Sequence, residues 1–206
     1  MRRHPYLSLV FSLCLWGAST EALAQEPGGG TDAKIAAATS AAPAAIAEGA
    51  AVVDWPTEPG GAMTELRAGS NGWVCFPDSP GSPRNDPMCL DPTFLDWAEA
   101  LNARTEPALT SVGFGYMLQG GSTASNSDPF ANAPAAGEEW LVEPPHVMMV
   151  VPDPSVLEGL PTDPTNGGPW IMWQGTPYAH VMMPVTDEGG AMHGSHPTAE
   201  DPAPER

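Results

Sequence analysis

Residues 170–184, WIMWQGTPYAHVMMP, form the longest apolar, β-favouring run after residue 24 and give the strongest indication of the fold. Runs rich in aromatic and branched residues that are bounded by turn residues are typical of strands. The Gly175-Thr176-Pro177 turn interrupts this run once. The pattern therefore predicts two strands, near Trp170–Trp173 and Ala179–Met183, joined by that turn.

Two upstream segments echo this run. Residues 116–121, YMLQGG, resemble its first half, and residues 146–149, HVMM, repeat its second half letter for letter. Six of the nine methionines after Met1 lie in these echoed segments: Met117, Met148, Met149, Met172, Met182 and Met183. The echo favours paired strands that pack against one another as a β core, with buried methionines filling the gaps between them.

Working outward, further strands are expected at 50–55, 63–67, 73–76, 112–118, 140–142 and 146–151. Asn71-Gly72 is a hairpin signal and predicts that the strands on either side of it pair. Asp91-Pro92 predicts the start of an amphipathic helix that runs to about Arg104. About seven short strands with local turns predict an α+β fold, a mostly antiparallel sheet with this one main helix packed on it.

The ends of the chain differ in composition from its middle. A basic start, an apolar run and Ala22-Leu23-Ala24 predict a signal peptide over residues 1–24, cut after Ala24, which places the protein in the periplasm or outside the cell. Residues 25–33 are expected to be a flexible leader, although Thr31 or Asp32 can cap a short helix. Residues 34–185 are expected to form one globular domain, and residues 186–206 a disordered acidic tail.

The net charge of the chain limits the classes of partner that it can bind. The chain has 25 acidic residues against 7 lysines and arginines, a formal net charge of −18. Such a surface repels phosphate backbones and anionic lipids, so nucleic acid and membrane partners are not expected. No run after the signal peptide is long enough to span a bilayer. We expect a monomer that binds a small ligand or an envelope protein. The acidity of the chain can also be explained simply as a means of keeping it soluble.

Two cysteines, Cys75 and Cys89, follow the signal peptide. In an oxidising compartment a lone pair is most simply a disulfide, and no further residues stand at the spacing of a thiolate metal site. Closing a 15-residue loop suggests about 3 kcal/mol of stabilisation by chain entropy.

Enzyme signatures are missing from the sequence: it has no phosphate loop, dinucleotide glycine motif, nucleophile elbow or zinc-protease helix. Many carboxylates stand before prolines, as Asp128 does, and an Asp-Pro pair is first of all a turn starter. A hydrolytic enzyme that uses loop carboxylates is therefore a weaker alternative to a non-enzymatic binding protein. No cofactor is expected under the leading interpretation.

A copper site is the second alternative. Residues two apart in a strand share a face, so His146 lies beside Met148, and His180 lies beside Met182. If the two strands pair, their imidazole and thioether groups can converge, and such ligands suit Cu(I), which occurs in exported bacterial proteins. Ordinary core packing explains the same residues without a metal.

A second candidate site is polar. Its members are hydrogen-bonding residues that accompany the aromatic residues of the opening run: Gln119, Ser125, Asn126, Asp128, Gln174 and Tyr178. A few polar groups among aromatic rings are typical of small-molecule pockets. Local capping of loops by Ser, Asn and Asp explains the same pattern.

Five segments together resemble a family of uncharacterised exported bacterial proteins with no assigned function. They are the residues 72–75 GWVC, 86–91 DPMCLD, 116–121 YMLQGG, 124–129 ASNSDP and 175–180 GTPYAH. The resemblance covers roughly residues 34–185 and implies an exported bacterial protein. It carries over no activity, cofactor or catalytic residue.

Overall fold

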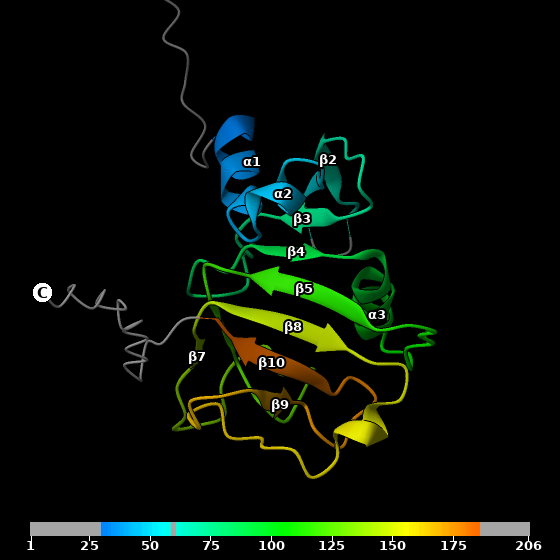
Figure 1. Ribbon diagram of the computed structural model, residues 1–206. Coiled ribbons are helices and arrows are strands. Elements are labelled where there is room, and N and C mark those ends of the chain that lie inside the picture. The colour runs from blue at the N-terminus through cyan, green and yellow to red at the C-terminus, as the bar shows by residue number, and fades with distance from the viewer. Residues whose placement is uncertain (1–29, 59–60, 186–206) are drawn as a thin grey trace, which may run out of the picture.

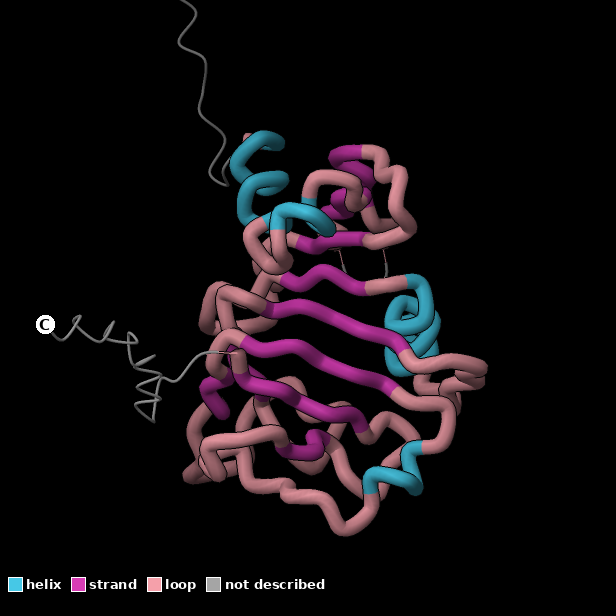
Figure 2. The backbone as a smooth tube through the Cα atoms, viewed as in Figure 1, coloured by secondary structure: helices cyan, strands magenta, loops and turns pink. Residues whose placement is uncertain are grey.

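The computed structural model describes residues 30–58 and 61–185. They form an eight-stranded sheet, a two-stranded sheet and a few helices (Figures 1 and 2). The helices are α1 (Thr31–Thr39), α2 (Ala44–Ala47), α3 (Pro92–Ala103) and the 3-10 turn η1 (Pro154–Leu157). The strands are β1 (Ala51–Asp54), β2 (Thr64–Arg67), β3 (Val74–Phe76), β4 (Met88–Leu90), β5 (Gly113–Met117), β6 (Gly121–Thr123), β7 (Leu141–Glu143), β8 (His146–Val150), β9 (Trp170–Met172) and β10 (His180–Pro184).

The large sheet has the strand order β2-β1-β3-β4-β5-β8-β10-β9, and β6 pairs with β7 in the small sheet. Every neighbouring pair is antiparallel except β1 and β3, which are parallel. The predicted mostly antiparallel sheet is confirmed in this coarse form. The large sheet is mixed, and β4 and β6 are strands that the sequence did not predict.

The opening run forms the predicted hairpin, since β9 and β10 pair antiparallel at one end of the sheet. Its upstream echo pairs in the same way, because β5 and β8 are also antiparallel neighbours. β8 and β10 then lie side by side in the centre of these four strands. The echoed segments therefore form one continuous block of sheet, β5-β8-β10-β9 (Figure 1).

The hairpin predicted at Asn71-Gly72 is wrong. β2 and β3 do not pair with each other but lie on opposite sides of β1. The chain crosses the start of β1, where a β-carbon on Gly69 would collide with the Ala51 backbone nitrogen. Asn71 holds the crossing in place, since its side chain donates to the Ile46 carbonyl and accepts from Trp73 N–H. Only a glycine permits this close approach of two backbones.

The predicted main helix is confirmed as α3. Asp91 is its N-cap, and the carboxylate accepts a 2.7 Å hydrogen bond from Phe94 N–H, while Pro92 fills the first turn. The other Asp91 carboxylate oxygen accepts from Phe114 N–H, also at 2.7 Å. One side chain therefore both starts the helix and attaches it to β5. The buried face of α3 carries Phe94 and Trp97.

The sheet has a core on each face. The α3 face holds the larger cluster, made of aromatic residues and methionines: Phe76, Leu90, Phe94, Trp97, Met117, Met148, Val150, Trp170, Met172, Tyr178 and Met182. On the opposite face, α1 and α2 cover the β1–β3 end with alanines around Val52. η1 covers the other end, where Leu157 packs on Ile171 and Val181.

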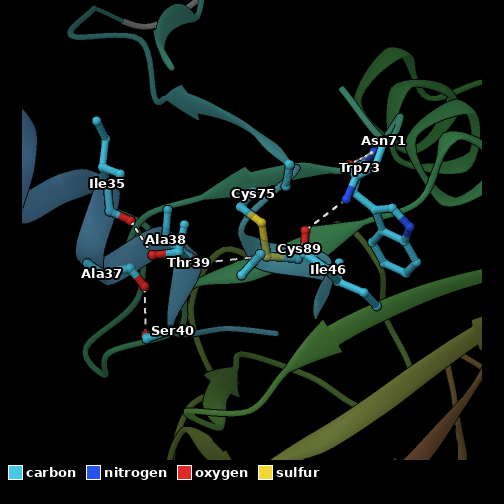
Figure 3. Close-up of a disulfide and its surroundings, with 12 residues drawn as sticks. Ile35, Ala37, Ala38, Thr39, Ser40, Ile46, Asn71, Trp73, Cys75 and Cys89 are labelled. Carbon is cyan, nitrogen blue, oxygen red and sulfur yellow. Dashed lines mark hydrogen bonds between the residues drawn. A yellow bond between two sulfur atoms is a disulfide. The ribbon is translucent and has the colours of Figure 1, made fainter. Parts of the chain in front are cut away.

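The predicted disulfide is confirmed between Cys75 and Cys89. The two residues are direct partners in the β3–β4 pair, and both are fully buried under α1, close to Ala38 (Figure 3). The bond joins the β1–β3 end of the sheet to the central strands. It therefore secures β4, whose three residues follow a loop of prolines and serines that packs little of its own surface.

Some expected boundaries are changed by the structure. α1 begins at Thr31 with Gly30 as its N-cap, so the last residues of the predicted leader are helical and neither Thr31 nor Asp32 caps the helix. β6 lies between the strands expected at 112–118 and 140–142, where no strand was predicted. The predicted signal peptide and acidic tail lie outside the described residues. Within residues 30–58 and 61–185, no helix has the length and apolar character that crossing a membrane requires.

Candidate metal centre

The echoed segments are repeated in space as well as in sequence. In the β5–β8 pair, Met117 stands directly opposite His146. In the β9–β10 pair, Met172 stands directly opposite His180. We call Met117, His146 and Met148 the His146 half, and Met172, His180 and Met182 the His180 half. Each half has one histidine, one methionine across from it and one methionine two residues further along its strand.

The two halves meet at a methionine pair. Met148 of β8 stands opposite Met182 of β10 in the register of the central strands. Because residues two apart share a face, both histidines and all four methionines project from the α3 face of the sheet. All six side chains are buried, with the exposed fraction between 0% for His146 and 6% for Met117 and Met148.

Both histidine rings are held by the same local hydrogen bond. His146 Nδ1 lies 2.7 Å from the Pro144 carbonyl oxygen, and His180 Nδ1 lies 3.0 Å from the Tyr178 carbonyl oxygen. Because a carbonyl only accepts, Nδ1 carries the proton in each ring, and Nε2 keeps a free lone pair. Histidines that bind metals are oriented by such a bond on their other nitrogen.

Both imidazoles are neutral in the folded protein. Burial lowers the pKa of His146 to about 4, against a smaller opposing effect of its bond to Pro144. Burial also lowers the pKa of His180 to about 4, against the opposing effect of its bond to Tyr178, and the charge of His146 adds a smaller lowering. A neutral ring with an available Nε2 is the form that binds metal ions.

His146 Nε2 is the single buried side-chain nitrogen or oxygen without a hydrogen-bond partner in the described part of the chain. Leaving a buried acceptor unpaired costs about 1–3 kcal/mol, and native structures rarely leave such a group without a reason. The unpaired lone pair lies in a fully buried ring between Met117 and Met148 on the same sheet face. This atom is the strongest sign of a binding function in the described residues.

The cover of the His146 half is the small sheet. Gly121 of β6 faces Met117, whose methyl carbon would lie 3.0 Å from a β-carbon on that glycine. The same point is 3.0 Å from Asp86 Cβ and 3.5 Å from Glu143 Oε2. Two buried carboxyl groups therefore approach this half, that of Glu143 from β7 and that of Asp86 from the loop before β4.

Those carboxyl groups hold protons unusually strongly. Burial, and to a smaller extent the charge of Asp86, raise the pKa of Glu143 to about 8. Burial also raises the pKa of Asp86 to about 6, although its hydrogen bond from Ser79 N–H opposes the shift. Glu143 is therefore mostly a neutral acid at neutral pH.

The cover of the His180 half is aromatic. The centroids of the Trp97 and Trp173 rings lie 5.0 and 5.1 Å from that of His180, and Phe94 lies at 6.3 Å, all edge to face. The two indoles stack on each other at 5.9 Å with an interplanar angle of 8°. α3 supplies Trp97 and Phe94, and the turn after β9 supplies Trp173.

Trp173 is held in place by the 124–127 loop. Its φ of +57° lies in the left-handed region, which is costly for a residue other than glycine. The loop stabilises this conformation, since Trp173 N–H donates to the Asn126 carbonyl at 2.8 Å and its indole N–H donates to the Ser125 carbonyl at 2.9 Å. The position of this indole beside His180 is thus fixed from two sides.

Within 30–58 and 61–185, no group of three or more His, Cys, Asp or Glu residues is arranged to hold a metal ion. Imidazole nitrogen together with thioether sulfur is a soft donor set that suits Cu(I).

The predicted copper set of His146, Met148, His180 and Met182 lies on one face, as expected from the strand periodicity. The register separates the two histidines by four residues of paired strand, or roughly 13 Å along the strands. Two imidazole nitrogens on one ion are at most about 4 Å apart, twice the usual metal–nitrogen bond length. The set therefore divides into two halves. Sequence reasoning missed Met117 and Met172 as members, although both lie in the echoed segments.

The predicted polar site has a different arrangement. Asn126 accepts from the Trp170 indole and donates to the Thr162 carbonyl, and Ser125 caps the following turn. Gln174 donates to the Leu157 carbonyl, and the Tyr178 hydroxyl donates to the Thr105 carbonyl.

Two members of that polar set serve elsewhere. Gln119 donates to the Ser40 carbonyl, near α1, and Asp128 accepts from Phe130 N–H. The structure thus assigns each of these side chains a bond within the fold. A shared ligand pocket for them stays a prediction.

A surface depression of about 360 Å³ lies between α1, the end of β1 and the 77–80 loop. Trp55 and prolines line it together with the charged residues Lys34, Asp54 and Asp78, of which the first two form an ion pair at 2.6 Å. It lies at the β1 end of the sheet, away from the repeated halves. Its best-placed charged groups already satisfy each other, so it offers less for recognition than the unpaired His146 nitrogen.

Comparison of the chain with protein-family profiles, with curated proteins and with solved structures gave no match.

Proposed function

We propose that the chain is an exported, non-enzymatic binding domain whose small ligand is a soft metal ion, with Cu(I) the best match to its donors. The observation that carries the proposal is the buried, unpaired Nε2 of His146 among methionines. A bound soft cation gives this lone pair the partner that the protein itself does not provide.

Three features of the His146 half support Cu(I) over other ions. Its donors are one imidazole and the thioethers of Met117 and Met148, and soft thioethers select Cu(I). The site is buried, so a single positive charge costs less to desolvate than a double one. The Nδ1–H bond to the Pro144 carbonyl fixes both the tautomer and the ring orientation before any metal arrives.

The test is an anaerobic competition between the chain from residue 25 onward and a chromophoric Cu(I) chelator. Hydroxylamine keeps the copper reduced and leaves the Cys75–Cys89 disulfide intact. We expect the protein to remove Cu(I) from the chelator at micromolar concentrations. Met117→Leu and Met148→Leu should each weaken binding at least about tenfold, since even outer partners of metal ligands contribute that much.

The same strands provide matched controls. Met149 and Met183 are neighbours of the proposed donors in sequence but project from the opposite face of the sheet, toward η1. Met149→Leu and Met183→Leu change the same atoms and should leave Cu(I) affinity unchanged. Leucine nearly conserves the volume of methionine, so all these variants should fold. Failure of the wild type to compete for Cu(I), or equal losses in tested and control variants, would reject the proposal.

A further inference from the structure

The His180 half repeats the His146 half in every feature that the backbone sets. Met172 is opposite His180 as Met117 is opposite His146, and each histidine is followed two residues later by a methionine on the same face. Both imidazoles donate Nδ1–H to the carbonyl of the residue two positions earlier. The repeat thus presents a second imidazole that is held through Nδ1, so that its Nε2 takes no part in that bond.

The aromatic cover adds a feature that the first half lacks. The Trp97 and Trp173 rings lie within 5.1 Å of His180, centroid to centroid. The face of an indole attracts a cation, most strongly where water is excluded, and Trp is the best side chain for this contact. Both rings are held rigidly, one by α3 and the other by its two hydrogen bonds to the 125–126 backbone.

From the repeated register and this cover, we infer that His180, Met172 and Met182 form a second soft-metal site, at which a tryptophan ring makes a cation–π contact with the ion. The chain then holds two monovalent ions, one in each half. The adjacent Met148 and Met182 of β8 and β10 mark the boundary between the two sites. This inference rests on the proposed metal-binding function, but it concerns a separate set of donors.

The experiment uses Ag(I), which is a redox-inert substitute for Cu(I), and follows both stoichiometry and tryptophan fluorescence. We expect two equivalents of Ag(I) per wild-type chain, with the fluorescence quenched as the His180 site fills. Met172→Leu should remove one equivalent and most of the quenching. Met117→Leu should remove the other equivalent and keep the quenching.

The outcomes separate the two proposals. Binding of one equivalent that Met117→Leu removes and Met172→Leu preserves would overturn the second site and leave the proposed function standing. One equivalent that only Met172→Leu removes would support the second site and overturn the assignment to His146. No binding by the wild type would overturn both.

A tryptophan substitution tests the cation–π contact directly. Trp97→Phe keeps an aromatic ring but weakens its attraction for a cation, so Ag(I) affinity at the His180 site should fall severalfold. Trp73→Phe is the matched control. Trp73 packs on Tyr116 in the core that α1 and α2 cover, on the opposite face of the sheet from His180. Equal affinity for wild type, Trp97→Phe and Trp173→Phe would show that no indole contacts the ion.

Discussion

The His146 half and the His180 half share a strand register, a histidine tautomer and a set of methionines, yet they are covered in different ways. β6, β7 and buried carboxyl groups approach the first, while α3 and two stacked indoles cover the second. The shared features come from the β framework, which places a methionine opposite each histidine. The differences come from the other segments, since β6 and β7 follow β5, whereas α3 precedes it and Trp173 lies in the turn between β9 and β10. A repeated pair of strands can therefore supply the same donors in two distinct electrostatic environments.

Removing part of the aromatic cover of the His180 half should strongly reduce the stability of the protein. Trp97 is 5% exposed and touches the rings of Phe94, Trp173, Tyr178 and His180. Trp97→Ala should lower the free energy of unfolding by about 3–5 kcal/mol, as large aromatic truncations in cores do. Urea denaturation followed by far-UV circular dichroism measures this loss. A loss below about 1 kcal/mol would mean that the aromatic cluster does not hold the His180 half together.

The His146 half should instead lose the stabilising contribution of Glu143 as the pH rises from 4.5 to about 8. Glu143 keeps its proton up to a pH of about 8 in the folded state but releases it near its ordinary pKa of 4.5 when unfolded. Between these values the folded state binds more protons at Glu143, so the contribution of this group to the free energy of unfolding falls as the pH rises. The slope is at most about 1.4 kcal/mol per pH unit, which amounts to a few kcal/mol overall.

Glu143→Gln should abolish that slope and make the protein more stable than wild type at pH 8, as denaturation at a series of pH values can measure. Asp86→Asn provides a contrast, because the pKa of Asp86 is raised only to about 6 and its contribution is exhausted above that pH. Acid acts on both halves, since each histidine has a lowered pKa and stability should fall as the pH drops from 6.5 toward 4. Identical slopes for wild type and Glu143→Gln up to pH 8 would contradict the assignment.

Periodicity and local signals were enough to predict the β9–β10 hairpin, the N-terminus of α3 and the disulfide. Each of these depends on residues close together in sequence or on a single pair of cysteines. The pairing of β8 with β10 was considered only as one possibility. It depends on contacts between segments about 30 residues apart, for which the HVMM echo gave the sole hint.

The remaining elements could not be predicted because tertiary contacts decide them. β4 has three residues after a proline-rich loop and is a strand because it pairs with β3 and β5. The chain bends at Asn71-Gly72, as this signal indicates. Gly69, however, allows the chain to cross β1, which places β3 on the far side of β1. Assigning Met117 and Met172 to the candidate site required the strand register, which sequence periodicity cannot supply.

The loop that positions the Trp173 indole gives a smaller effect within the His180 half. Asn126→Ala removes the acceptor of the Trp170 indole N–H, which is fully buried, and the donor to the Thr162 carbonyl. We expect a loss of about 1–3 kcal/mol, the cost of leaving a buried donor unpaired. Quenching by Ag(I) at the His180 site should weaken too, while binding at the His146 half stays as in wild type. A variant that loses both sites equally would show that the halves are not independent.

The smallest effect is expected at Asp128, on the outer edge of the aromatic cover. Its carboxylate accepts from Phe130 N–H at 2.9 Å, and Phe130 in turn packs on Tyr178 with the rings 5.5 Å apart. Asp128→Ala should therefore cost no more than about 1 kcal/mol, as the loss of a local side-chain cap does, and both Ag(I) equivalents should remain. Asp153→Ala is the matched control, since Asp153 accepts from Ser155 N–H in the same way at η1, outside both halves. A change in metal stoichiometry for Asp128→Ala but not for Asp153→Ala would mean that the 124–130 loop belongs to the His180 site rather than merely supporting it.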